Sequence, residues 1–171
     1  MDLILWRHAE AESASEEGLD LERGLTARGE RQAARMAKWL DRQLPEGAKI
    51  YCSPAQRCQQ TVQHLGRKFK VRDELSPQCD HTHLLSLVQW PHSRLTVLIV
   101  GHQPALGHTM AQVLGLTQMA SPIRKGSVWW VRSKSKDDSM QASLHAVMTP
   151  DRKSTRLNSS HRCISYAVFC L

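Results

Sequence analysis

Residues 95–102 read LTVLIVGH, the most apolar run of the chain followed directly by a glycine and a histidine. The run contains β-branched residues and is bounded by polar ones, which predicts a central strand buried on both faces. Pro104 comes two residues later, where a proline favours the start of a helix. This strand-to-helix junction is typical of open α/β sheets, whose ligand sites lie at the carboxyl ends of the strands.

Strands and helices alternate through the rest of the sequence. Apolar runs predict strands at 3–6, 49–52, 95–100, 127–132 and 140–148, with a short strand or extended stretch at 71–75. We expect a loop at 9–22 and a polar turn at 134–139. Apolar residues at steps of three and four predict helices after Thr26 up to residue 44, and at 58–69, 83–90 and 104–114. This order predicts a three-layer α/β/α sandwich with a mostly parallel sheet and an antiparallel edge.

The last segment of the chain, residues 151–171, is set apart from this pattern. It contains the strings DRKSTRLNSSH and ISYAVFCL, which are similar to the in-frame translation of a common sequencing adapter. We therefore expect one domain at 1–150 and a non-native tail at 151–171; the alternative is a genuine final strand, ISYAVF. The formal charge of the whole chain is +7. Without the tail's four basic residues and one acidic residue, the domain is near +4, which is ordinary for a globular domain.

The cysteine spacing and the hydropathy pattern indicate where in the cell the protein is located. Cys52, Cys58 and Cys79 show no short paired spacing, so we expect reduced thiols and a cytoplasmic location. We find no secretory leader and no apolar run of the roughly 18–20 residues that a membrane span needs. The modest charge and the lack of an aromatic platform favour neither a nucleic-acid partner nor a membrane partner.

Arginine and histidine side chains follow the ends of the predicted strands. Arg7 and His8 end the first strand, Arg57 lies one turn past the second, and His102 follows the apolar run. A rigidly held histidine can donate one ring N–H to a carbonyl and keep the lone pair of its other nitrogen. Guanidinium groups offer paired donors to phosphate oxygens. Each motif alone also fits an ordinary surface or core residue, but together they predict a site for a phosphoryl group.

The combination of motifs resembles the histidine phosphatase superfamily, with its phosphoglycerate mutase-like fold. The matching segments are LILWRHAEAE, ERGLTARGERQA, YCSPAQRCQQT and LIVGHQPALG, and the resemblance covers residues 1–150. Within this superfamily, the short layout without an inserted lid is similar to the SixA-type phosphohistidine phosphatases. The family uses no metal and no organic cofactor, so we expect neither here.

The resemblance also implies roles for individual residues. His8 would be the nucleophile that takes up the phosphoryl group, while Arg7, Arg57 and His102 would bind its oxygens. Arg23 matches a position near the mouth of the pocket, where it would contact substrate. The usual glycine after the first histidine is Ala9 here, and we expect the added methyl group to be tolerated.

A general acid is not evident from the sequence. Larger family members carry a glutamate in a segment that this chain lacks. The available carboxylates are Glu10, Glu12, Glu74 and Asp80, of which Glu74 is the candidate because it follows a predicted strand. A nitrogen leaving group needs less help from an acid than an alkoxide. We therefore expect a phosphatase that acts on phosphohistidine in a partner protein. The alternatives are a phosphatase for a small phosphorylated metabolite and a non-catalytic phosphate-binding module.

Several further residues are interpreted as structural. The histidines His81, His83 and His92 lack nearby ligands that would complete a metal site. Cys58, next to Arg57, is expected to pack in its helix; a lowered thiol pKa is the alternative. The adjacent Trp129 and Trp130 should face opposite sides of a strand, one of them in the core and the other at a pocket rim or edge.

Overall fold

A computed structural model of the chain describes residues 1–13, 19–116, 122–136 and 139–150. The expected tail at 151–171 lies outside these residues. Six strands form one sheet in the order β3-β2-β4-β1-β5-β6. The strands are β1 (Asp2–Arg7), β2 (Lys49–Cys52), β3 (Lys70–Val71), β4 (Thr96–Gly101), β5 (Val128–Lys136) and β6 (Ser139–Met148). The helices are α1 (Ala27–Asp41), α2 (Gln56–Gln63), α3 (His81–Leu87) and α4 (Ala105–Val113), with 3₁₀ turns η1 (Asp20–Glu22) and η2 (Asp73–Leu75).

The apolar run at 95–100 lies in the middle of the sheet, in strand β4. Strand β4 pairs in parallel with β1 on one side and with β2 on the other, and β2 pairs in parallel with β3. Strand β5 pairs antiparallel with β1, and β6 antiparallel with β5. The predicted parallel sheet with an antiparallel edge pair is therefore confirmed.

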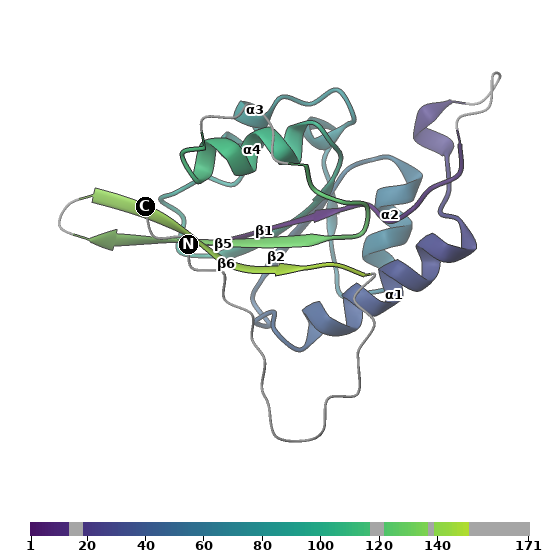
Figure 1. Cartoon of the computed structure of the whole chain (residues 1–171), viewed down its shortest axis with the longest axis horizontal. Helices are drawn as coiled ribbons and strands as arrows, with labels where there is room; N and C mark the ends of the chain where they lie inside the picture. The colour runs from purple at the N-terminus through teal and green to yellow at the C-terminus, as the bar shows by residue number, and fades with distance from the viewer. Residues whose placement is uncertain (14–18, 117–121, 137–138, 151–171) are drawn as a thin grey trace.

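Two apolar cores lie on opposite faces of this sheet. Leu98 and Val100 of β4 pack in one core with residues of α1 and α2, including Met36. The alternate residues Val97 and Ile99 pack in the other core with α3 and α4. Figure 1 shows α3 and α4 on one side of the sheet and α1 on the other, which gives the three layers.

The late strands are longer than hydropathy predicts. The polar turn expected at 134–139 is wrong, because β5 continues to Lys136 and β6 begins at Ser139. Polar residues such as Lys134 and Gln141 pair across this ladder. Backbone hydrogen bonds hold a two-stranded ribbon together without buried side chains, and Figure 1 shows the ribbon projecting beyond the helices.

Other boundaries differ for local reasons. Helix α2 ends at Gln63 rather than at Phe69, since Gly66 adopts a left-handed backbone with φ of 68°. Phe69 still packs against the core from beyond the helix. The stretch 71–75 divides into the end of β3 and the turn η2, and α3 ends at Leu87.

The tryptophan pair does face opposite sides of β5. Trp130 is buried in the core beneath α1, whereas Trp129 packs against the core beneath α4. Both side chains thus pack between the sheet and its helices. Trp129 contributes to a core rather than to a pocket rim. No helix in the described part of the chain combines the length and hydrophobicity required to cross a bilayer.

Candidate active site

The carboxyl ends of β1, β2 and β4 meet at one edge of the sheet. Arg7 pairs with Gly101 in the register of β1 and β4, so His8 and His102 follow side by side. The backbone N–H of His8 donates to the carbonyl of Gly101 over 3.1 Å, and the N–H of Ser53 donates to that of Val100 over 3.0 Å. The ring centroids of His8 and His102 are 5.1 Å apart. The structure therefore brings together the two histidines predicted from the sequence.

His8 has a fixed orientation and a free ring nitrogen. Its Nδ1 lies 2.8 Å from the carbonyl oxygen of Ala9, which can only accept, so Nδ1 carries the proton. The ring is buried, and burial together with the positive charges of Arg57, Arg7 and Lys125 lowers the pKa of His8 to about 4. The side chain is consequently neutral near pH 7, with the lone pair on Nε2.

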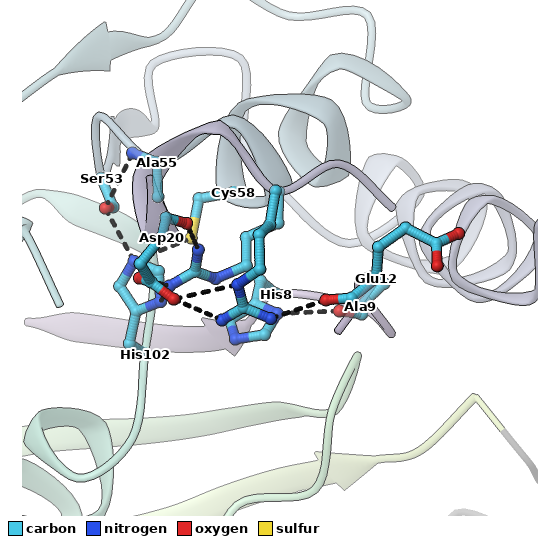
Figure 2. Close-up of polar contacts among 10 residues, drawn as sticks. His8, Ala9, Glu12, Asp20, Ser53, Ala55, Cys58 and His102 are labelled. Atoms are coloured by element: carbon cyan, nitrogen blue, oxygen red, sulfur yellow. Dashed lines mark hydrogen bonds and ion pairs between the residues drawn. The ribbon is translucent and has the colours of Figure 1, made fainter. Parts of the chain in front are cut away.

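His102 is held as a neutral ring by partners on both nitrogens. Burial, the neighbouring His8 and Arg57 lower the pKa of His102 to about 3. Arg57 NH2 lies 3.3 Å from Nδ1, and a guanidinium can only donate, so Nδ1 accepts. The proton is then on Nε2, which lies 2.8 Å from Oγ of the buried Ser53. Figure 2 shows the contact between His102 and Ser53 at one end of this chain of hydrogen bonds.

The two predicted arginines present positive charge, one buried and the other partly buried. Arg57 lies in the first turn of α2 and is 3% exposed. Arg7 ends β1, and its NH1 donates to the carbonyl of Ile123 over 2.6 Å. Burial lowers the pKa of Arg7. Within the described residues no hydrogen-bond partner reaches the buried Nε atom of either arginine. These unsatisfied donors favour an anionic ligand.

Asp20 is a site residue that sequence reasoning did not identify. Its Oδ2 accepts from Arg57 NH2 over 2.8 Å, and its carbonyl accepts from Arg57 NH1 over 2.6 Å. The predicted Arg23 joins the site through the same residue, since its NH2 and Nε donate to Asp20 Oδ1 over 2.6 and 2.9 Å. Arg23 NH1 also donates to the carbonyl of Glu12 over 2.7 Å. The spacing of Asp20 and Arg23, three residues apart in a helical turn, was the available signal.

The other predicted carboxylates lie elsewhere. Glu74 is exposed in η2, which follows β3, and β2 and β4 separate β3 from the strand of His8. The structure thus does not bring Glu74 to the histidine pair. Glu10 accepts from Thr26 Oγ1 over 3.1 Å and lies 3.5 Å from Arg28, while the exposed Asp80 pairs with His81.

The backbone of the loop after His8 is held by side chains from two helices. The N–H of Ala9 donates to Thr61 Oγ1 of α2 over 3.1 Å, and the N–H of Glu10 donates to Gln32 Oε1 of α1 over 3.0 Å. Ala9 is absent from the described residues with positive φ, so its backbone conformation is open to an L-residue. A Cβ built on Gly29 of α1 would overlap the Glu10 carbonyl oxygen. The helix can approach the loop this closely only because residue 29 is glycine.

The cysteine and the histidines interpreted as structural lie outside the phosphoryl site or are buried in the core. Cys58 is fully buried, and burial raises the pKa of its thiol to about 12, so the alternative of a lowered pKa is wrong. His81 packs edge to face against His108, with ring centroids 5.5 Å apart. Among the described residues there is no group of three or more histidine, cysteine, aspartate or glutamate side chains that could hold a metal ion.

The arrangement is suited to phosphoryl transfer. A neutral imidazole nitrogen can attack phosphorus, and guanidinium groups can neutralise the charge on the equatorial oxygens. The fold places these groups at the carboxyl ends of parallel strands, where α/β enzymes bind their ligands. Fold and site together define an α/β enzyme class that works on phosphoryl groups.

Comparison with known proteins agrees with this class. Residues 3–83 match the model of the histidine phosphatase superfamily (branch 1). The chain is 29% identical to phosphohistidine phosphatase SixA of Escherichia coli over 122 residues, which are 66% of this chain and 74% of that protein. A structure from Nakamurella multipartitia, proposed to be SixA, is 26% identical with a TM-score of 0.69, over 88% of this chain and 96% of that one. SixA complexed with tungstate superposes with a TM-score of 0.68 at 24% identity, over 88% and 97%.

The family model matches residues 3–83, and this match together with the similarity to SixA supports a phosphatase. The chain's phosphoglycerate mutase-like fold is the one that the resemblance implies.

Proposed function

We propose that this phosphatase transfers the phosphoryl group to Nε2 of His8 and then to water, and that its substrate is a phosphohistidine in a partner protein. The observation that carries the proposal is the 2.8 Å contact between His8 Nδ1 and the carbonyl of Ala9. This contact leaves the lone pair of Nε2 free, and the lowered pKa keeps it free at neutral pH. A nucleophile of this kind needs no metal ion for its activation.

Arg7, Arg57 and His102 would hold the phosphoryl group in line with His8. Arg57 is buried and Arg7 partly buried, and His102 would bind an oxygen once phosphate has taken Arg57 from its Nδ1 and that nitrogen has gained a proton. By analogy with the removal of one oxyanion donor, loss of any of these three groups should lower kcat by about 10²–10³. Arg23 would act at the rim, through its contact with Asp20.

The choice of phosphohistidine follows from the leaving group. A general acid would have to be a protonated carboxyl near the leaving group, and the carboxylate that contacts Arg57 is that of Asp20. Although burial raises its pKa, hydrogen bonds and charge from Arg23 and Arg57 lower it overall, so the carboxyl is ionised rather than an acid. A nitrogen leaving group departs with less acid assistance than an alkoxide. The names of the relatives in E. coli and Nakamurella point to the same substrate class.

The test compares substrates and variants of the full chain. Phosphate release is measured from a phosphohistidine peptide, p-nitrophenyl phosphate and a sugar phosphate, with and without EDTA. We expect the peptide to have the highest kcat/KM, EDTA to have no effect, and His8→Ala to abolish turnover. His83→Ala, which alters an exposed histidine of α3, is the matched control.

Three results would contradict the proposal. Full turnover by His8→Ala would exclude the nucleophile. Loss of activity in EDTA would exclude the metal-independent mechanism. A preference for the sugar phosphate would assign the protein to the small-molecule phosphatases instead.

A further inference from the structure

Asp20 occupies the place that a phosphoryl group needs on Arg57. Its Oδ2 accepts from NH2 of Arg57 over 2.8 Å, while its Oδ1 accepts two hydrogen bonds from Arg23. Asp20 also differs from the rest of the site in exposure, since its side chain is 46% exposed and that of Arg57 only 3%. The carboxylate therefore lies at the solvent side of a buried cation.

An incoming phosphoryl group competes with this carboxylate. Both are anions that accept from guanidinium N–H donors, and NH2 of Arg57 also lies 3.3 Å from His102 Nδ1. When phosphate oxygens take Arg57, Oδ2 of Asp20 must leave it. Oδ1 can stay on Arg23, which belongs to the same helical turn region and does not depend on Arg57.

The displaced carboxylate would then lie near the leaving group. His8 is buried at the base of the site, 7% exposed, and attack on phosphorus proceeds in line, with the leaving group opposite the nucleophile. The leaving group thus points toward solvent, the side on which Asp20 lies. An ionised carboxylate there repels the anionic phosphoryl group of either substrate, but only a leaving group that carries positive charge compensates this by attraction.

We infer that Asp20 is a specificity-determining residue that selects phosphoramidates with a cationic leaving group, such as the protonated imidazole of phosphohistidine, over phosphate esters. The inference rests on the proposed function of the site. The displaced Oδ2 accepts the N–H of the imidazolium nitrogen that does not carry phosphorus. The resulting charge-assisted hydrogen bond is available only to that class of substrate.

The transfer step balances without another reactant. Nε2 of His8 forms a bond to phosphorus as the bond from phosphorus to the substrate nitrogen breaks. The bonding electrons go to that nitrogen, and the proton already on the other ring nitrogen remains, so the product is neutral imidazole. An ester oxygen has no such proton and leaves as an anion beside the carboxylate of Asp20.

The experiment uses Asp20→Asn in the full chain. The kcat/KM is measured for a phosphohistidine peptide and for p-nitrophenyl phosphate, and inorganic phosphate is tested as an inhibitor of ester hydrolysis. We expect the ratio of peptide to ester kcat/KM to fall about tenfold, from the loss of one charge-assisted hydrogen bond. Inhibition by phosphate should strengthen roughly fivefold, because the internal competitor has lost its charge.

Two control variants isolate the charge at position 20. Glu22→Gln removes an exposed carboxylate from the same turn and should leave the ratio and phosphate inhibition unchanged. Asp20→Glu keeps the charge and should restore most of the preference for the peptide. Thermal melts followed by circular dichroism check that each variant is folded.

The outcomes separate the inference from the proposed function. If wild type does not hydrolyse the peptide, the proposed substrate and this specificity role both fail. If wild type prefers the peptide and Asp20→Asn keeps that preference, only the inference is overturned. An equal loss on both substrates with weaker phosphate inhibition would also overturn it, because Asp20 would then merely position Arg57.

Discussion

Replacement of Gly29 by alanine should test how the loop after His8 is held in place. Gly29 lies in the first turn of α1 and is buried. A Cβ at this position would overlap the carbonyl oxygen of Glu10 and lie 2.9 Å from its carbonyl carbon and 3.2 Å from its nitrogen. All three atoms belong to the backbone of the loop after His8, so no side-chain rotation can relieve the overlap. The helix or the loop must move.

Two opposing effects set the magnitude. Helix propensity alone predicts that Gly29→Ala stabilises the protein by about 1 kcal/mol. Forcing a methyl group into a packed position costs typically about 1–3 kcal/mol, and the high end applies where backbone has to shift. We therefore expect a net loss of about 1–2 kcal/mol in the free energy of unfolding. A displacement of the loop by about 1 Å should also lower kcat roughly 10²-fold, because His8 directly precedes it.

Urea denaturation and initial rates with p-nitrophenyl phosphate measure the two effects. Gly47→Ala is the matched control, since a Cβ at that glycine would meet nothing within 4 Å. The control should keep wild-type activity and wild-type stability or better. If Gly29→Ala were as stable and as active as wild type, the close approach of α1 would not be what positions the loop.

The remaining predictions concern protonation, a thiol and a helix cap. Because the pKa of His8 is about 4, activity should stay constant from pH 7 to 5 and fall as the pH passes through 4; a midpoint near 6.5 would exclude the buried neutral ring. The free energy of unfolding should decrease from pH 6.5 toward 4, because His8 and His102 bind protons in the unfolded chain but stay neutral in the folded protein. The midpoint of urea denaturation, measured as a function of pH, checks this. The Cys58 thiol should resist iodoacetamide at pH 8 until the protein unfolds, as mass spectrometry of the labelled peptide would show. Thr26→Ala should cost about 1 kcal/mol in urea denaturation through loss of the cap on the N–H of Gly29, and Thr26→Ser should not.

The central strands could be predicted because their sequence obeys one dominant physical rule. Strand β4 has helices on both faces, so both of its faces must be apolar, and the run at 95–100 shows this directly. The histidines could be predicted for a related reason. A polar residue immediately after a buried strand comes to the sheet edge whatever the loop that follows does, as with His8 and His102.

Features that depend on backbone conformation or on distant contacts could not be predicted in this way. The polar ends of β5 and β6 pair through backbone hydrogen bonds, and hydropathy patterns do not detect such pairing. Helix α2 ends where Gly66 takes a left-handed conformation, although the apolar steps continue to Phe69. Asp20 lies in a stretch without periodicity, and its importance comes from a contact with Arg57, 37 residues later in the chain.

The position of β1 within the sheet has a consequence for biosynthesis. This strand is made well before its partners: Leu3 pairs with Val97 on one side and Val131 on the other. The backbone N–H and carbonyl of His8 likewise form hydrogen bonds with Gly101 and Gly126, which are made much later. Long-range pairing of this kind is slow to form and leaves an unpaired apolar strand exposed in nascent chains. A ribosome-bound chain that ends before Val131 should therefore depend on chaperones and lack phosphatase activity, which would appear only when β5 pairs with β1.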